Sequence, residues 1–348
     1  MEKNGILVNG ASGRIGRFVT YELIKAGLPV AALNDLVDTD AIVRNYTRRD
    51  TTHGALDWKV EKINEGLIKI NDEEIKIMHE KDASQMGLKE NGINIVEECS
   101  GLYDGKKIDP NVFLENGAQR VIMSYPAKIK DATIIMGVNQ DTYNPEKHRL
   151  ISNASCTTKA LAAPLKVLLN NGIGIDALLM DTVHAATNSQ RLLDFGDDYA
   201  ALNQISTHKT GAAIATAEVI PSLLDKMDGI SFRVPTLDGS FANLYFAANH
   251  EGKLEREELN NLLRESTSYT KYCGRLAVYE GKEAASTDII GRTENSIVIA
   301  SKTRVIPLPY SLNGRNTSLV SLVCGYDNER GPPKDQVLLT KYILANSP

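Results

Sequence analysis

The chain has 348 residues and a formal net charge of −5, with 42% hydrophobic and 24% charged residues, as in an ordinary globular protein. At roughly 100–200 residues per domain, this length predicts two domains. The acidic balance argues against nucleic acid or a membrane surface as the primary partner, because both attract a basic face. No apolar run reaches the length of a membrane span, and residues 1–10 lack the order of a signal peptide, so we expect a cytoplasmic protein.

Strand and helix signals alternate through the first third of the chain. Apolar runs at 5–10, 29–35, 93–101 and 120–127 read as strands, and 16–27 reads as a helix that ends at a glycine. This order predicts a parallel α/β sheet, which binds ligands at the carboxyl ends of its strands. Small and polar residues occur at these ends: Gly10, Asn34, Asp35, Ser100, Gly101 and Ser124.

The pattern changes after Cys156. Long β-rich segments predict a mostly antiparallel sheet, and a last helix follows two prolines; the β-rich segments are 177–187, 230–239, 241–249, 295–306 and 316–328. We therefore expect an α/β protein with a Rossmann-type dinucleotide-binding domain at 1–154 and an α+β catalytic domain at 155–324. The helix-bearing segment 325–348 is expected to return to the first domain.

A glycine motif, VNGASGRIGR at 8–17, joins the first predicted strand to the first helix. Glycines at such a turn let the backbone approach a pyrophosphate, which then lies at the helix N-terminus. Asp35 lies 19 residues beyond Gly16, the spacing expected for an acidic residue that binds the adenosine ribose. The alternative is an ordinary turn followed by a surface aspartate.

Cys156 stands in SNASCTTK, at the start of a predicted helix. The positive end of a helix dipole lowers the proton affinity of a thiol, and neighbouring hydroxyls and amides suit an oxyanion. His184 follows 28 residues later on a strand-like run and would serve as an acid–base partner. The alternatives are a buried structural cysteine and a structural histidine. The four cysteines are too far apart for a CxxC or zinc pattern, so no metal is expected.

Two further features could hold an anion. Thr210 and Gly211 precede a helix-like run and could present amides, and Arg233 in a β segment could pair with a phosphate. A helix cap and a solvated arginine are the alternatives.

These motifs, in this order, resemble phosphorylating glyceraldehyde-3-phosphate dehydrogenase. The resemblance rests on SNASCTTK, TVHAAT, TGAA, FRVPT and YDNE, with NDLVDTDA, HGAL, ECSG and MGVN in agreement. It implies that Cys156 is the nucleophile, that His184 is its acid–base partner, and that a thioester passes to phosphate after NAD has taken the hydride. It also implies a homo-oligomer, expected as a tetramer, whose partners are a phosphorylated aldehyde and inorganic phosphate.

The resemblance also implies binding roles. Thr187 and Arg233 would hold the phosphate of the substrate, and the attacking phosphate would contact Ser155, Thr157, Thr210 and Gly211. The NAD contacts would be Gly10, Gly13, Arg14, Ile15, Asp35, Ser124 and Asn328, with Asp35 on the ribose and Asn328 on the nicotinamide amide.

The chain departs from the family pattern at several places. The glycine loop has one extra residue, Lys159 stands where the family usually has asparagine, and the segment 191–209 is shortened and lacks an arginine-rich stretch. Lys209 is a candidate replacement for the lost positive charge. Two alternatives therefore stay open: another phosphorylated aldose, such as erythrose 4-phosphate, as substrate, and an NAD-binding relative without turnover. A role like that of aspartate-semialdehyde dehydrogenase fits TVHAAT and YDNE less well.

Overall fold

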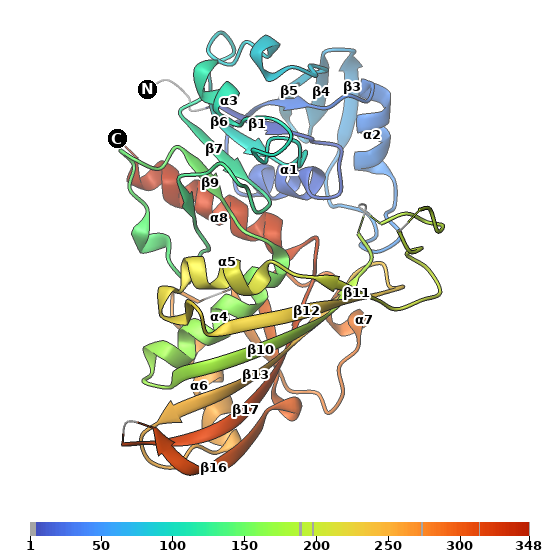
Figure 1. Ribbon diagram of the computed structural model, residues 1–348. Helices are drawn as coiled ribbons and strands as arrows, with labels where there is room; N and C mark the ends of the chain where they lie inside the picture. Colours follow the sequence, from blue (N-terminus) through green and yellow to red (C-terminus); the bar gives the residue numbers. More distant parts are fainter. Residues whose placement is uncertain (1–4, 188–189, 197, 273, 313, 348) are drawn as a thin grey trace. The chain divides into compact units, whose positions relative to one another are not determined.

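A computed structural model of the chain describes residues 5–187, 190–196, 198–272, 274–312 and 314–347 (Figure 1). The fold divides into two compact units. Unit 1 consists of Met1–Ile134, Gln140–Ala154 and Pro332–Pro348, and unit 2 of Ile135–Asn139 and Ser155–Gly331. Each unit is built around its own sheet.

The sheet of unit 1 has nine strands in the order β3-β4-β5-β2-β1-β6-β7-β9-β8. The parallel part confirms the predicted α/β pattern and contains β1 (Gly5–Asn9), β2 (Val30–Asn34), β6 (Ile93–Glu98), β7 (Arg120–Met123), β8 (Ala132–Thr133) and β9 (Leu150–Ser152). The sequence did not predict the extension that contains β3 (Val60–Asn64), β4 (Leu67–Ile70) and β5 (Glu73–Met78). In this extension β3–β4 and β4–β5 are antiparallel, and β5 pairs in parallel with β2.

The helices of unit 1 connect these strands. They are α1 (Gly16–Lys25), α2 (Thr39–Thr47), α3 (Asn111–Glu115) and α8 (Gly331–Asn346), with 3-10 turns at Ala83–Gln85 and Gln140–Thr142. Two side chains of α8, Gln336 and Thr340, donate hydrogen bonds to the buried carboxylate of Glu97 on β6. The last helix is thereby tied to the centre of the sheet.

The C-terminal helix begins at Gly331, so the segment 325–330 expected with it is not helical. Strand β17 continues to Tyr326, and the Asp327 carboxylate then accepts hydrogen bonds from the amides of Glu329 and Arg330. This aspartate turn satisfies the local amides and precedes the helix.

The sheet of unit 2 has eight strands, of which seven follow the order β11-β12-β10-β13-β17-β15-β14 while β16 pairs with β17. Most pairs are antiparallel, as predicted, and two, β10–β12 and β14–β15, are parallel. The strands are β10 (Gly174–Ala185), β11 (Ser206–Lys209), β12 (Met227–Val234), β13 (Ser240–His250), β14 (Leu276–Tyr279), β15 (Ser296–Ile299), β16 (Arg304–Leu312) and β17 (Arg315–Tyr326).

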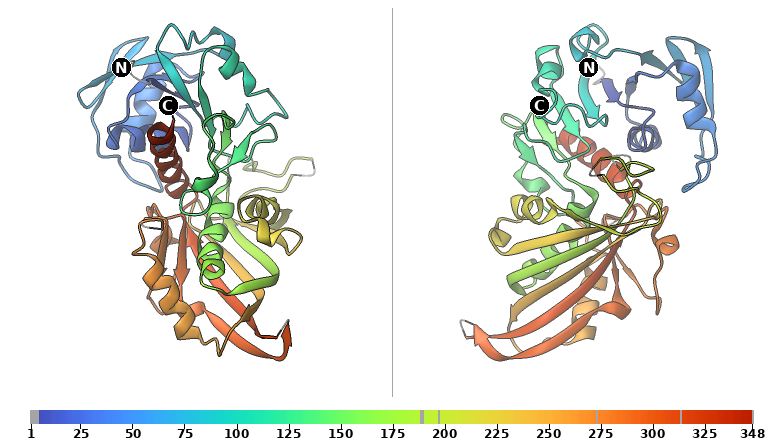
Figure 2. Two further views of the ribbon diagram at one scale, coloured as in Figure 1. Left: turned by 90° about the vertical axis from the view of Figure 1, so that its left-hand side faces the viewer. Right: turned by 45° about the vertical axis from the view of Figure 1, so that its right-hand side comes forward.

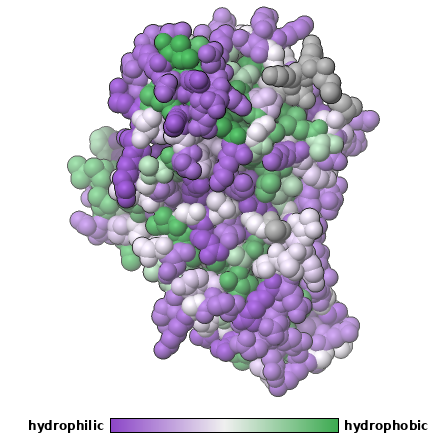
Figure 3. Space-filling view, turned by 180° about the vertical axis from the view of Figure 1, so that it is seen from behind, coloured by the Kyte–Doolittle hydropathy of each residue, from purple (hydrophilic) through white to green (hydrophobic). Residues whose placement is uncertain are grey.

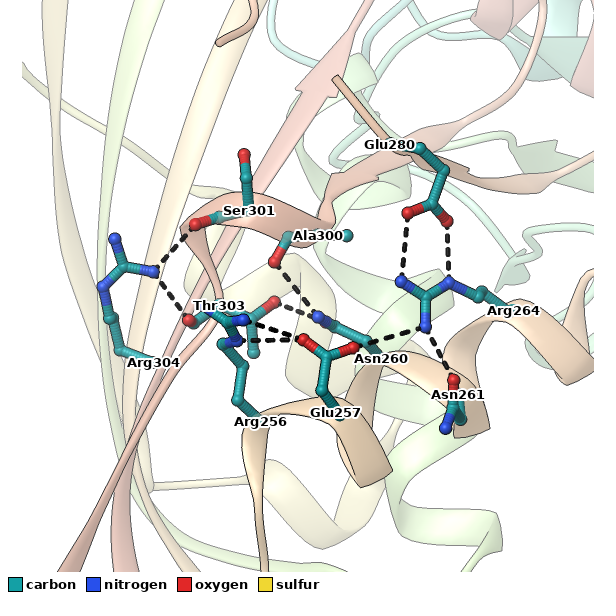
Figure 4. A network of polar contacts seen from close by, with 10 residues as sticks. All are labelled: Arg256, Glu257, Asn260, Asn261, Arg264, Glu280, Ala300, Ser301, Thr303 and Arg304. Carbon is teal, nitrogen blue, oxygen red and sulfur yellow. Dashed lines mark hydrogen bonds and ion pairs between the residues drawn. The ribbon is translucent and has the colours of Figure 1, made fainter. Parts of the chain in front are cut away.

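Helices cover one face of this sheet (Figures 1 and 2). The unit contains α4 (Cys156–Asn170), α5 (Ala212–Val219), α6 (Arg256–Ser266) and α7 (Ser286–Ile289), with 3-10 turns at Pro221–Leu223 and Ala300–Lys302. On α6, Arg264 forms a two-pronged ion pair with Glu280, and buried Asn260 bonds to Ala300 O and to the Thr303 hydroxyl (Figure 4). These contacts fix α6 against the segments that flank β15 and β14.

Hydrophilic side chains cover most of the face seen in Figure 3, with hydrophobic residues in scattered patches. Scattered surface apolar residues are ordinary in folded proteins. Within the described ranges, no helix combines the length and the apolar character needed to cross a membrane.

Candidate active site

Cys156 occupies the first position of α4 in unit 2. The Ser155 hydroxyl caps this helix by accepting a hydrogen bond from the Thr158 amide at 3.1 Å, which fixes where the helix starts. The residue before the cap, Ala154, has a positive φ of 57°, a costly conformation for a residue with a Cβ. The backbone therefore enters the helix through a strained turn and presents the thiol at its N-terminus.

His184, on β10, lies beside this thiol. Its Nε2 is 3.5 Å from Cys156 Sγ, so the predicted cysteine–histidine pair is formed. On the other side of the ring, Arg233 Nη1 lies 2.5 Å from Nδ1. Nδ1 also lies 2.8 Å from Ala185 O, so the guanidinium of Arg233 and the Ala185 carbonyl together hold this side of the ring.

Burial determines the protonation of both groups. Desolvation, with the nearby charge of Arg233, lowers the pKa of His184 to about 4, so the imidazole is neutral near pH 7. Desolvation also raises the pKa of Cys156, while the charge of Lys159 and hydrogen bonds from Thr157 act in the opposite direction. The expectation of a thiol with lowered proton affinity is therefore wrong for the unliganded site, because burial outweighs the stabilising groups.

Arg233 and Asn328 complete the surroundings of His184. Arg233 lies opposite His184 in the parallel register of β10 and β12, and its Nη1 also bonds to Ala185 O at 3.2 Å. Asn328 Nδ2 lies 3.1 Å from His184 Nε2, and its Oδ1 accepts a hydrogen bond from the Ser240 hydroxyl. Three of the residues predicted from separate motifs, His184, Arg233 and Asn328, are thus neighbours.

A chain of hydroxyl groups supports the start of α4 from the sheet. The Tyr326 hydroxyl lies 3.0 Å from the Thr157 hydroxyl and 2.7 Å from that of Thr182, and all three residues are buried. Thr157, which was predicted as a phosphate ligand, is therefore already engaged in the protein's own network. Ser155 likewise contributes its hydroxyl to the helix cap.

The remaining predicted anion ligands of unit 2 lie in less regular segments. Thr187 follows β10, and its amide bonds to the Gln190 side chain. Thr210 and Gly211 stand between the edge strand β11 and helix α5, where the Thr210 hydroxyl accepts from the Ala212 amide. Lys209, at the end of β11, is exposed.

In unit 1 the glycine motif forms the turn between β1 and α1. Gly10 has φ +77°, and a Cβ there would lie 2.8 Å from the Ser100 amide nitrogen. A Cβ on Gly16 would lie 2.0 Å from Gly10 O, and one on Gly13 would lie 3.3 Å from the same oxygen. At Gly10 and Gly16 other backbone atoms of the chain lie too close for a side chain, so the turn requires glycine at the first and third positions of the motif.

Asp35 follows β2 and meets this turn. Its carboxylate accepts a hydrogen bond at 2.9 Å from the amide of Ser12, which belongs to the lengthened part of the loop. Arg14 and Ile15 lead into α1, and Ser124 follows β7, where its amide bonds to Glu98 O at the end of β6. These residues stand at the carboxyl ends of neighbouring parallel strands, and the crevice there is where such sheets bind nucleotides.

Sequence reasoning missed three residues of the catalytic unit. Tyr326 carries the hydroxyl chain, Ser240 bonds to Asn328 and to the Ala185 amide, and buried Asp238 accepts from the Asn328 amide. Tyr326 lies in the GYDN segment that was singled out, but its side chain resembles that of any core tyrosine. Asp238 and Ser240 occur in an ordinary turn sequence, LDGS. They reach the site because β13 pairs with β17, a strand far away in the sequence.

A dinucleotide-type fold in one unit and a cysteine–histidine pair in the other are the features expected of a dehydrogenase with a cysteine nucleophile. Comparison with known proteins narrows this class. The family profile described as "Glyceraldehyde 3-phosphate dehydrogenase, NAD binding domain" matches residues 5–106, and the one described as its C-terminal domain matches residues 155–328.

Individual relatives agree over nearly the whole length. The chain is 38% identical over 344 residues to glyceraldehyde-3-phosphate dehydrogenase of Geobacillus stearothermophilus, covering 97% of each chain. It is 36% identical over 342 residues to glyceraldehyde-3-phosphate dehydrogenase 1 of Bacillus subtilis, again covering 97% of each. It is 36% identical over 350 residues to the enzyme of the same name from Chlamydia pneumoniae. The chain belongs to the glyceraldehyde-3-phosphate dehydrogenase family.

Proposed function

We propose that this protein is an NAD-dependent glyceraldehyde-3-phosphate dehydrogenase that oxidises and phosphorylates its substrate to 1,3-bisphosphoglycerate. The observation that carries the proposal is the Cys156–His184 pair, with Sγ and Nε2 3.5 Å apart, in a chain of this family. The protein would act in glycolysis or gluconeogenesis, in the cytoplasm.

The reaction begins when the Cys156 thiol passes its proton to Nε2 of His184, which lies 3.5 Å from Sγ, and becomes a thiolate. The thiolate adds to the aldehyde carbon and forms a tetrahedral alkoxide, which the Nε2–H of His184 stabilises by donating a hydrogen bond. NAD, when bound, would supply the acceptor for the hydride that leaves this carbon. The C–O bond then becomes a carbonyl, and the product on the protein is a thioester of Cys156.

Phosphate completes the turnover. A phosphate oxygen attacks the thioester carbonyl, the Cys156 thiolate leaves, and the acyl phosphate is released. A thioester keeps the acyl group activated, whereas an ester of serine would resist this attack, which is why the nucleophile is a thiol. We assign Arg233 and Thr187 to the phosphate of the substrate, and Ser155, Thr157, Thr210 and Gly211 to the attacking phosphate.

The residues of unit 1 fit NAD. Gly10 and Gly16 allow the tight turn that brings the backbone to the N-terminus of α1, since a Cβ at either position would meet other backbone atoms of the chain. Asp35 accepts a hydrogen bond from the same loop. We assign the pyrophosphate to Gly10, Gly13, Arg14 and Ile15, the ribose to Asp35, and further cofactor contacts to Ser124 and Asn328. We also propose that the segment 1–154 with the C-terminal helix is the NAD-binding domain and 155–324 the catalytic domain.

A homo-oligomer, expected as a tetramer, is the second part of the proposal. The face of the unit 2 sheet opposite its helices carries exposed apolar side chains on five strands: Leu179, Ile230, Tyr245, Ile306 and Leu319. Leu179 is 62% exposed and pairs across the strands with Tyr245, and Ile306 pairs with Leu319. A contiguous apolar face of this kind is typical of a protein–protein interface. Light scattering should give a multimer for the wild type and smaller species for Tyr245→Lys; a monomeric wild type would contradict this assignment.

The enzymatic proposal is tested by measuring NADH formation with a panel of phosphorylated aldehydes, with and without phosphate. We expect glyceraldehyde 3-phosphate to give the highest kcat/KM and turnover to require phosphate. Cys156→Ser should bind NAD and give no turnover, with Cys324→Ser as the matched control. A higher kcat/KM for erythrose 4-phosphate would assign the enzyme to that substrate, and absence of turnover with every aldehyde would identify a silent relative.

A further inference from the structure

Unit 2 contains a cavity at a different place from the Cys156–His184 pair. It has a volume of about 370 Å³ and is lined by helix α6, the turn between α4 and β10, the end of β13 and the start of β17. We call it the α6 cavity. Among the described residues that line it, none belongs to the predicted catalytic or cofactor sites. A cavity of this size accommodates a small organic molecule.

Four apolar residues line the α6 cavity. Ile173 follows α4 and Leu254 precedes α6, and both are buried. Leu259 and Leu262 stand three residues apart on α6, a spacing that puts their side chains on one face of the helix. These side chains form an apolar surface on which the apolar part of a ligand is removed from water.

Charged residues of both signs line the same cavity. Arg315 and Lys253 are cations and Glu251 and Glu258 are carboxylates, so their formal charges cancel. A ligand with only a negative charge would be repelled by the two carboxylates, and one with only a positive charge by the two cations. The lining is therefore complementary to a ligand that carries one charge of each sign. Lys253 already pairs with Glu255, which leaves Arg315 as the available cation.

Arg315 is held in place and still has donors to offer. Its Nη2 donates a hydrogen bond to Gly172 O, and its Nη1 lies 4.0 Å from Glu251 Oε1, which is too far for a hydrogen bond. Its buried Nε has no hydrogen-bond partner in the described part of the chain. A guanidinium carries five N–H donors in a planar fork that fits a carboxylate. Arg315 is thus suited to bind the carboxylate of a ligand.

Glu258 is the corresponding anion on α6. Its neighbour Glu257 pairs with Arg256 and Arg264 (Figure 4), whereas Glu258 forms no ion pair within the residues that the structure describes. An exposed carboxylate at the edge of a cavity is available to an ammonium group, which can donate charge-assisted hydrogen bonds to it.

We propose that the α6 cavity binds a zwitterion with an apolar side chain, which is the chemistry of an apolar α-amino acid. The ligand carboxylate binds the guanidinium of Arg315, and its ammonium group binds the carboxylate of Glu258. The apolar side chain contacts Leu254, Leu259 and Leu262. This inference does not rest on the proposed dehydrogenase activity, because it uses other residues and its test measures binding alone.

The experiment titrates L-phenylalanine into the intact chain in the presence of NAD and follows binding by saturation-transfer difference NMR. We expect a Kd of about 1 mM or lower, an ordinary value for a molecule of this size. 3-Phenylpropionate lacks the ammonium group and 2-phenylethylamine lacks the carboxylate. Each should bind at least about tenfold more weakly, because it leaves one charged group of the cavity without its partner.

Two substitutions separate the two charges. Glu258→Gln should weaken binding of phenylalanine at least about fivefold without weakening that of 3-phenylpropionate. Arg315→Met should weaken binding of both carboxylates by a similar factor without weakening that of 2-phenylethylamine. Glu265→Gln removes an exposed carboxylate of α6 that does not line the cavity, and it should leave all three affinities unchanged.

Three results would overturn the proposal. The first is the lack of saturable phenylalanine binding up to about 10 mM. The second is a single-charge analogue that binds as tightly as phenylalanine, since the cavity would then not select a zwitterion. The third is phenylalanine binding that is unchanged in both Glu258→Gln and Arg315→Met, which would place the ligand elsewhere. Thermal melting establishes that each variant is folded, and Arg315→Lys, which lacks the planar fork, replaces Arg315→Met if the latter does not fold.

Discussion

At the scale of single residues, burial changes the pKa values of the two side chains that form the centre of the site. The thiol and the imidazole come from a helix start and a strand that are 28 residues apart in sequence, and both are desolvated. The two ring nitrogens of His184 have different partners, with sulfur near Nε2 and Arg233 near Nδ1. The orientation of the ring is therefore set by the protein before substrate arrives.

His184→Asn should lower kcat by about 10²–10⁴-fold, because it removes the group that takes the thiol proton and stabilises the reacting oxygen. Since the pKa of His184 is about 4, its ionisation should produce no change in rate between pH 6 and 9. Initial-rate kinetics across this range give both results. His250→Asn, a buried histidine at the far end of β13, is the matched control. Equal kcat in the two variants would make His184 structural.

The protein should prefer NAD to NADP. The Asp35 carboxylate would repel a 2′-phosphate and accept hydrogen bonds from a free ribose hydroxyl. Asp35→Ala should narrow the ratio of kcat/KM values for the two cofactors, whereas Asp38→Ala, at the cap of α2, should leave it unchanged. A wild type that prefers NADP would show that the bond between Asp35 and the lengthened loop has altered the site.

At the scale of elements, helix α8 is hydrogen-bonded to the carboxyl group of Glu97, and burial changes the pKa of this group. Burial raises the pKa of Glu97 from 4.5 to about 7, while Gln336 and Thr340 donate to its carboxylate. Because the folded pKa lies above the unfolded one, the contribution of Glu97 to stability is full below about pH 4.5 and is lost as the pH rises through about 7. Its neighbour Glu98 has a raised pKa for the same reason.

Unit 1 should therefore lose stability between pH 5 and 8, and Glu97→Gln should lose about 3 kcal/mol less over this range. Urea unfolding followed by the fluorescence of Trp58 measures it, since this single tryptophan belongs to unit 1 and stacks on Tyr46. Glu115→Gln, at an exposed position of α3, should behave as the wild type does. A Glu97→Gln protein with the pH dependence of the wild type would refute the assignment.

Helix α6 depends on one buried amide. Asn260→Ala should cost about 1–3 kcal/mol of unfolding free energy, because Ala300 O and the Thr303 hydroxyl would lose a buried partner. Asn261→Ala, at the neighbouring exposed position, should cost less than about 0.5 kcal/mol. Urea unfolding by circular dichroism compares them. Equal losses of unfolding free energy in the two variants would mean that the buried hydrogen bonds of Asn260 in Figure 4 do not stabilise the protein specifically.

The elements also show what sequence patterns predict. Strands β1, β2, β6 and β7 were recognised because each is almost fully buried and contains several apolar residues. Strands β3 to β5 were missed because their exposed residues are charged and interrupt the apolar pattern, as in β3, where only Val60 is buried. Pro164 stands inside α4, where local propensity alone would predict a break.

At the scale of the whole molecule, the two sheets, their mostly parallel and mostly antiparallel character, and the family were all predictable from ordered motifs. The hydrogen bonds between distant segments of the chain that build the site were not predictable in this way. Tyr326, Ser240 and Asp238 reach the site through strand register between segments that are far apart in sequence, and single-sequence patterns contain no register. The raised pKa of Cys156 was also missed, because desolvation depends on everything that surrounds the thiol.

The central claim is that oxidation proceeds through a thioester on Cys156 that only phosphate releases efficiently. Rapid mixing of the enzyme with NAD and glyceraldehyde 3-phosphate in phosphate-free buffer should give a burst of about one NADH per subunit and then a nearly flat trace. Addition of phosphate should restore steady turnover, and Cys156→Ser should give neither phase. Sustained NADH formation without phosphate, or a phosphate-dependent rate in Cys156→Ser, would contradict the account.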